Sequence, residues 1–311
     1  MNTLRNSFIA LMFLMTLFVG VLHAEEQKPA QDPKKVDGKE VHEVITEKGA
    51  ALEHTVTPPT APVSGSAAIG IFNKYIFRGY ELSNKSFVIQ PTVSVSYKNF
   101  SATLWSNIDS SVHPTQSTIG DYSGYITNNR GQKKYNETDL TLSYTYILNK
   151  LSLTGGYIYY GTSYAHETEE LFASATYDMI AHPTLAIYRD INAYAGTYFN
   201  LALSQSFPVY KEITLDLGAS AGYEAGSGTF WKTFNTTTGN YDGKKYSALH
   251  DGMVKAGFTI PVAKNVNVQP VAQYWFPLSG KAKRVVNGSD YNPNGHLDET
   301  FVYGLNMTLT F

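Results

Sequence analysis

The last eleven residues of the chain, Phe301 to Phe311, read FVYGLNMTLTF. Every odd-numbered position carries an apolar side chain, whereas the even-numbered positions carry smaller or more polar ones. Successive side chains of a strand point to opposite faces of a sheet, so a period of two predicts a strand with one apolar face. The pattern continues to the final residue, which is aromatic.

The same alternation recurs along most of the chain after residue 65. We expect twelve strands at 66–80, 87–97, 100–109, 137–148, 151–162, 169–179, 183–189, 195–207, 212–224, 248–261, 265–277 and 298–311. Short links such as Lys98-Asn99 and Asn149-Lys150 alternate with longer ones such as 110–136 and 225–247. Short turns at one end and longer loops at the other are the plan of an outer-membrane barrel. The sequence therefore predicts an all-β, transmembrane antiparallel barrel over 66–311, with both ends of the chain periplasmic.

A soluble β-sandwich also alternates, and two features count against it. The polar face consists mainly of Ser, Thr, Asn, Gly and Gln rather than of Lys and Glu. Aromatic residues crowd the strand ends, as at Tyr97, Phe100 and Phe207, where the aromatic girdles of membrane barrels lie. We therefore expect contact with outer-membrane lipid and a location in the bacterial outer membrane.

The segment before the barrel differs in composition. Residues 1–24 are predicted to be a secretory signal peptide, because Arg5 precedes an apolar run from Phe8 to Val21. An uncleaved membrane anchor is the alternative. Residues 25–65 are rich in proline and charge, which is typical of a flexible periplasmic arm. A periplasmic partner could bind this arm through a short helix.

Composition excludes several kinds of function. The net charge of −2 gives no indication of nucleic-acid binding, and only 16% of the residues are charged. The chain has no cysteine, so it has no disulfide, thiolate metal site or cysteine nucleophile. Phosphate-binding glycine loops and metal-type histidine spacings are absent from the sequence. No cofactor is predicted.

Closure of the barrel explains the apolar end of the chain. The last strand must pair with the first, because an open edge in lipid leaves backbone groups unpaired at a cost of several kcal/mol each. Phe311 would then lie in the aromatic girdle near the periplasm. A terminal Phe also resembles the C-terminal signal by which the barrel-assembly machinery recognises outer-membrane proteins, so we expect Phe311 to act in assembly.

Short motifs near the first strands resemble a known family. Tyr75-Ile76-Phe77-Arg78-Gly79, followed by Gln90-Pro91 and Trp105-Ser106-Asn107, resembles the porin-like family often called TorF or Gcw_chp. The residues between Gly79 and Gln90 depart from the family pattern, which has Ser-Gln soon after Arg-Gly. The resemblance implies a bacterial outer-membrane barrel of porin type and no established substrate.

The alternation also predicts which side chains face the inside of the barrel. The predicted pore-lining charges are Lys74, Arg78, Asp109, Asp139, Asp216, Asp251 and Lys255, with further carboxylates at Glu170, Asp178, Glu212 and Glu224. Most other inward positions carry small polar side chains, which leave room for water. We therefore expect a porin-like channel for passive diffusion of small hydrophilic solutes, with Lys74 and Arg78 at its constriction. A lumen closed by packed side chains, and thus a non-conducting structural or surface-binding barrel, is the alternative.

An enzymatic barrel is not predicted. A lipase needs a Ser–His pair on the outer wall, and His250, expected to face outward, has Ala248 and Gly252 as same-face neighbours in sequence. A protease needs clustered Asp and His at the rim, and His113, His166 and His296 have no matching acidic motif.

One loop partly matches a calcium site. Asp290, Asn292 and Asn294 place oxygen ligands at alternate positions, and Gly295 and then Asp298 follow, as in the first nine positions of a calcium loop. Phe301 stands where the bidentate Glu belongs. A plain Asn-Pro-Asn-Gly turn without metal is the favoured interpretation.

Overall fold

The structure is a computed structural model, and it describes part of the chain. The described residues are 41–45, 51–55, 63–83, 86–110, 134–163, 165–235, 237–238, 240–286 and 297–311. The chain divides into two units, residues 1–40 and 41–311, and only the second contains described residues. The predicted signal peptide therefore lies outside the described residues. In the predicted arm, β1 (Val41–Ile45) and β2 (Ala51–Thr55) pair as a two-stranded antiparallel sheet.

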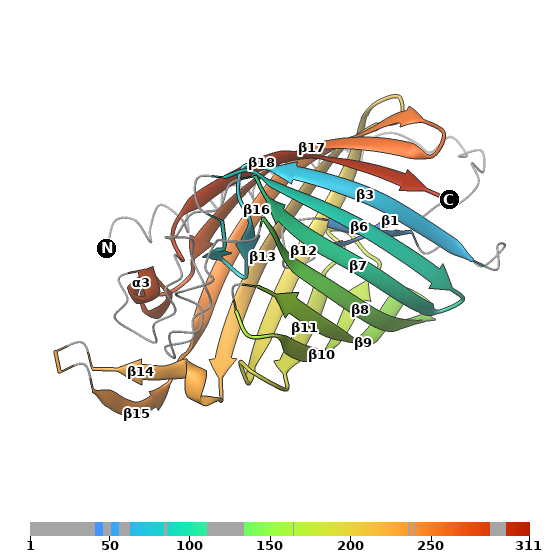
Figure 1. Cartoon of the computed structure of the whole chain (residues 1–311). Helices are drawn as coiled ribbons and strands as arrows, with labels where there is room; N and C mark the ends of the chain where they lie inside the picture. The colour runs from blue at the N-terminus through green and yellow to red at the C-terminus, as the bar shows by residue number, and fades with distance from the viewer. Residues whose placement is uncertain are drawn as a thin grey trace, which may run out of the picture. The chain divides into compact units, whose positions relative to one another are not determined.

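Twelve antiparallel strands form one closed barrel, as the alternation predicts (Figure 1). They are β3 (Ser64–Phe72), β6 (Val88–Tyr97), β7 (Phe100–Asp109), β8 (Tyr135–Leu148), β9 (Leu151–Thr162), β10 (Thr168–Tyr177), β11 (Thr184–Asp190), β12 (Gly196–Tyr210), β13 (Ile213–Gly226), β16 (Ser247–Ala263), β17 (Val266–Pro277) and β18 (Thr300–Thr310). Each strand falls on one of the twelve predicted stretches. The all-β fold class is thus confirmed.

The first and last barrel strands pair with each other. Strand β3 pairs with β18 from Ser66 opposite Thr310 to Phe72 opposite Gly304. Beyond Thr310, Gly65 and Phe311 exchange two backbone hydrogen bonds of 2.8 and 2.9 Å. Every other barrel strand pairs with its neighbour in chain order. The expected closure by the C-terminal segment is therefore confirmed.

The two ends of the barrel differ in their connections. At one end, two-residue turns join β6 to β7, β8 to β9, β12 to β13 and β16 to β17. Each of these turns contains a lysine, namely Lys98, Lys150, Lys211 or Lys264. The start of β3 and the end of β18 lie at this same end (Figure 1). We call it the short-turn end and the opposite one the long-loop end.

The outer face of the barrel is apolar. Large apolar side chains are exposed along every barrel strand, including Leu104, Leu142, Leu185 and Phe258. On β18, Phe301, Tyr303, Leu305, Met307 and Leu309 all point outward and are exposed, as their odd spacing predicts. No helix among the described residues is long and apolar enough to cross a membrane.

The inner face near the short-turn end carries small hydroxyl side chains that bond one another across strands. Ser94 pairs with Thr103 at 2.9 Å and Ser96 with Ser101 at 2.8 Å. Thr145 pairs with Thr154, and Thr176 pairs with Thr184, both at 2.9 Å. This half of the wall is lined by hydroxyl pairs from neighbouring strands, which hold each other in place.

The first strand ends earlier than the sequence suggests. Strand β3 stops at Phe72, not near residue 80, and the chain then turns inward. Two short strands, β4 (Ile76–Phe77) and β5 (Tyr80–Glu81), form a hairpin around Arg78-Gly79. Both turn residues have positive φ, 46° and 79°, as a tight two-residue hairpin turn requires. We call residues 73–83 the inward hairpin.

The inward hairpin packs against the lumen wall near the long-loop end. Its buried apolar residues Tyr75, Ile76, Tyr80 and Leu82 belong to the same core cluster as the wall residues Phe72, Val88, Trp105, Met253, Trp275 and Val302. The ring centroids of Tyr75 and Trp105 are 5.4 Å apart. The hydrophobic core of this barrel therefore lies inside it, at one end.

Further short elements follow the wall at the long-loop end. The 3-10 helix η1 (Thr229–Trp231) leads into β14 (Lys232–Phe234), which pairs with β15 (Tyr241–Lys245). Helix α3 (Gly280–Val286) follows β17 and contacts β16 and β17. Trp231, Ala282 and Val285 from these elements join the same core cluster.

Candidate functional site

A buried ion pair fixes the tip of the inward hairpin to the barrel wall. Arg78, at the hairpin turn, donates from both terminal nitrogens to the two carboxylate oxygens of Glu170 on β10, at 2.9 and 2.7 Å. Tyr160 on β9 donates to the same carboxylate at 2.8 Å. Both charged side chains are buried, at 9% and 4% exposure. This bidentate geometry is the strongest form of an arginine–carboxylate contact.

Aromatic rings surround the guanidinium group. Its central carbon lies 4.5 Å from the ring centroid of Tyr198, 4.9 Å from that of Phe77 and 5.2 Å from that of Tyr188. Tyr198 in turn donates to Asp251 at 3.0 Å. Arg78 and Asp251, both predicted to line the pore, are far apart in the sequence. In the structure Tyr198 contacts both of them, so they belong to one cluster of side chains.

Lys74 has a different environment from Arg78. Its ammonium group bonds Glu81 of the same hairpin and the Thr300 hydroxyl on β18, both at 2.9 Å. The sequence suggests that Lys74 and Arg78 project inward from the first barrel strand, predicted at 66–80. That prediction is wrong, because β3 ends at Phe72. Both instead lie on the inward hairpin, which carries them into the lumen.

The other predicted lumen residues are dispersed over the wall. Asp109 accepts hydrogen bonds from Asn136 and from Ser86, the latter at 3.2 Å. Asp139 is buried and lies opposite Trp105 on β7. Near the short-turn end, Asp216 accepts from Ser206 and Thr259, both at 2.6 Å. Lys255 lies opposite Gly218 there, and its side chain occupies the space that a Cβ on that glycine would need.

Two predicted lumen carboxylates lie elsewhere. Asp178 and Glu212 are in short turns, after β10 ends at Tyr177 and after β12 ends at Tyr210. His250 was expected to face outward and instead is fully buried. A register shift between Ala221 and Tyr223 in the β13–β16 pairing breaks the simple alternation and turns His250 inward. Its Nδ1 lies 2.7 Å from the Tyr246 hydroxyl.

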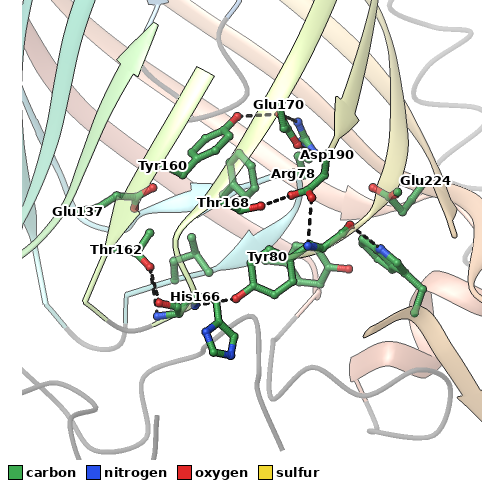
Figure 2. A pocket seen from close by; sticks show the side chains of 16 residues that line it. Arg78, Tyr80, Glu137, Tyr160, Thr162, His166, Thr168, Glu170, Asp190 and Glu224 are labelled. Carbon is green, nitrogen blue, oxygen red and sulfur yellow. Dashed lines mark hydrogen bonds and ion pairs between the residues drawn. The ribbon is translucent and has the colours of Figure 1, made fainter. Parts of the chain in front are cut away.

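A cavity of about 70 Å³ lies beside the inward hairpin at the long-loop end (Figure 2). Among the described residues, four carboxylates line it, from Glu137, Glu170, Asp190 and Glu224. Aromatic side chains of Phe77, Tyr80, Tyr160, Tyr194 and Trp231 form much of the remaining lining. The sequence predicted two of these carboxylates, Glu170 and Glu224, to be inward, but it did not indicate the cavity, because the hairpin that completes it was expected to be strand.

Most of the candidate calcium loop lies outside the described residues. Asp290, Asn292 and Asn294 lie outside the described residues, while Asp298 accepts a hydrogen bond from the backbone of Glu299 at 2.7 Å. Within the part of the chain that the structure describes, no group of three or more His, Cys, Asp or Glu could hold a metal ion.

Comparison with known proteins finds structural similarity and no sequence family. No family model and no curated protein matches the chain. The NanC porin is 9% identical, with a TM-score of 0.47, and the match covers 79% of this chain and all of that one. The KdgM porin is 11% identical, with a TM-score of 0.44 over 80% of this chain and 99% of that one. The COG4313 outer membrane channel from Pseudomonas putida F1 is 10% identical, with a TM-score of 0.44 over 82% of this chain and all of that one.

Proposed function

We propose that the chain forms an outer-membrane channel through which small hydrophilic solutes diffuse passively. The apolar outer face supports the membrane location, because exposure to water of large apolar side chains on every barrel strand is unfavourable. Closure of the barrel also leaves no unpaired strand edge, which lipid requires. In this proposal the short-turn end, where β3 begins and β18 ends, faces the periplasm.

The hydroxyl-lined half of the lumen is the observation that carries the channel function. Near the short-turn end the inward residues are mainly Ser, Thr and Gly, as at Ser94, Thr103, Thr145 and Gly218. A twelve-stranded barrel is wider than the eight-stranded barrels that side chains fill. Short polar side chains on a wall of this size leave space for water.

The inward hairpin would then form the constriction. It brings Lys74 and Arg78 into a lumen whose other charges are mainly carboxylates, among them Glu170 and Asp251. Opposed charges at a narrow point set the ion selectivity of many pores. We propose that Lys74 and Arg78 reduce a cation preference that the acidic wall would otherwise impose.

A non-conducting barrel is the second candidate, and a specific observation favours it. The hairpin residues Tyr75, Ile76 and Tyr80 are at most 4% exposed and pack with Trp105, Trp275 and Met253 inside the barrel. Packing of this kind resembles a protein core rather than a loose loop. It is compatible with a plug that blocks the lumen.

Planar-bilayer recording of the refolded full-length protein tests both candidates. The wild type and Arg78→Met are compared, with Glu212→Gln as a matched control that removes a charge from an exposed turn at the short-turn end. Current steps in the wild type support the channel. Steps in Arg78→Met alone support a channel that the ion pair holds closed. If both stay silent over many insertions while gels show a folded barrel, the channel proposal is wrong and the second candidate stands.

A further inference from the structure

We propose that the four turn lysines at the short-turn end bind the phosphate groups of anionic phospholipids in the membrane around the barrel. We call Lys98, Lys150, Lys211 and Lys264 the rim lysines. The proposal rests on the membrane location and not on conduction, so it holds for an open channel and for a closed barrel. Four observations lead to it: the charge of the turns, the distribution of the lysines around the barrel, their contacts with exposed rings and the backbone of their turns.

The rim lysines carry charges that the described residues do not neutralise. All four are exposed. Within the parts of the chain that the structure describes, no carboxylate lies at ion-pair distance from any of them. Two acidic side chains also lie in the turns at this end, namely Asp178, which is 3.5 Å from His182, and Glu212. The described turns thus carry more positive than negative charge, which attracts anionic groups.

The rim lysines surround the barrel rather than forming a patch on one side. Around the closed sheet, four strands lie between the Lys98 turn and the Lys211 turn in either direction. The same holds for the Lys150 turn and the Lys264 turn. The four charges therefore form two pairs on opposite sides of the barrel. A protein bound to one side would contact only part of this ring, whereas lipid surrounds the whole barrel.

Exposed rings place two of the ammonium groups beside the lipid-facing wall. The Nζ atom of Lys98 lies 5.3 Å from the ring centroid of Tyr97, and that of Lys211 lies 5.2 Å from the ring centroid of Tyr210. Tyr97 is 50% exposed and continues the outward-facing row of β6. An ammonium group over an outward-facing ring at the end of a strand is placed where lipid headgroups meet the acyl chains.

The backbone of these turns shows that lysine is not the residue that local geometry favours. Lys98 and Lys211 occupy the first turn position with φ of 53° and 51°. Positive φ is uncommon for residues other than glycine, and among them it is asparagine, aspartate and histidine that adopt it most readily. Asn149, with φ of 52°, is such a residue in the β8–β9 turn. Lysine at positions where glycine or asparagine would cost less indicates a use for its charge.

Quenching of tryptophan emission by brominated lipid tests the proposal in the refolded full-length protein. Phe100 is 62% exposed and lies opposite Tyr97 in the β6–β7 pairing, so Phe100→Trp supplies a reporter beside Lys98. The three native tryptophans are at most 7% exposed, so bromine in the surrounding acyl chains should quench mainly the reporter.

Vesicles contain phosphatidylglycerol and phosphatidylcholine in fixed proportion, with bromine on the chains of either one or the other. The two degrees of quenching give the relative occupancy of the two lipids beside the reporter. We expect phosphatidylglycerol to be favoured up to about fivefold at low salt, the factor that about 1 kcal/mol for one lysine near an anionic surface represents. Salt at about 1 M should reduce this preference, because it screens charges within about 3 Å.

Variants in the reporter background separate the charge of Lys98 from the shape of its turn. Lys98→Gly removes the charge and suits the positive φ, so it should remove the preference without straining the turn. Lys98→Arg keeps the charge and should keep the preference. Lys134→Gln is the matched control, because Lys134 is an exposed lysine beside the exposed Tyr135 at the long-loop end. It should leave the preference unchanged.

Several results would overturn the proposal. Equal quenching by the two brominated lipids with Lys98 in place would exclude binding of anionic lipid at this turn, and a preference that persists in Lys98→Gly would exclude the lysine as its cause. An equal preference in Phe301→Trp, a reporter at the long-loop end of β18, would show that the rim is not the site. Absence of quenching by either lipid would refute the membrane location and this inference together, whereas a silent bilayer recording would refute the channel alone.

Discussion

Replacing Arg78 by Met should release the inward hairpin from the wall. The substitution retains a long side chain at the same positive-φ position, so its main effect is to leave Glu170 buried without its cation. Removing one partner of a buried ion pair costs about 3–5 kcal/mol. The apolar contacts of Tyr75, Ile76 and Leu82 remain, so we expect local opening of the hairpin rather than unfolding of the barrel.

The size of this effect follows from the lost ion pair. A cost of about 3–5 kcal/mol corresponds to an open hairpin that is about 150- to 5,000-fold more populated in Arg78→Met than in the Arg78 background.

Labelling of an introduced thiol measures this opening directly. The chain has no cysteine, so Leu82→Cys, at a buried hairpin position, supplies a single reporter. The ratio of the labelling rate in Arg78→Met to that in the Arg78 background, both carrying Leu82→Cys, cancels the intrinsic reactivity of the thiol. Adding Glu170→Gln to Arg78→Met should restore slow labelling, because it removes the buried charge that has lost its cation. Absence of recovery in the double variant would show that Arg78 acts through packing and not through charge.

Two further perturbations test the proposed constriction and the closure of the barrel between β3 and β18. Replacing both Lys74 and Arg78 by Ser should raise the cation preference, seen as a shifted reversal potential in a salt gradient, because both substitutions remove positive charge from an acidic lumen; unchanged selectivity would count against a constriction at the hairpin. Deleting Phe311 removes its two backbone hydrogen bonds with Gly65 and should lower the amount of folded barrel in the outer membrane, seen as loss of the heat-modifiable band on gels. Normal folded levels after this deletion would contradict a role of Phe311 in assembly.

The strands could be predicted from the sequence because the alternation within each strand shows which of its faces is apolar and which is polar. Alternation of the kind seen in Phe301–Phe311 requires only that one face be apolar and the other polar, and this holds for every barrel strand. Antiparallel pairing of chain neighbours then follows from the short turns. Closure between β3 and β18 follows from the absence of any other partner for the outer edges of the sheet.

The inward hairpin could not be predicted because it continues the same alternation. Tyr75 and Phe77 alternate with Lys74 and Arg78, as they would in a longer first strand. The one local signal was Gly79 after Arg78, a residue suited to the positive φ of a tight turn. The inward position of His250 was hidden for a related reason, since a local register shift leaves no mark on the residue pattern. The cavity combines Glu137, Asp190 and Trp231, which only the folded chain brings together.

The hydroxyl pairs of the lumen wall have a consequence for the speed of passage in the proposed channel. Ser94 with Thr103, Ser96 with Ser101 and Thr145 with Thr154 bond each other across strands at 2.8 to 2.9 Å. A hydroxyl engaged in this way has less capacity to form hydrogen bonds with water or with a solute in the lumen. This part of the wall would therefore bind such molecules only weakly. In the proposed channel the time that an uncharged solute spends in the barrel would then depend mainly on the inward hairpin.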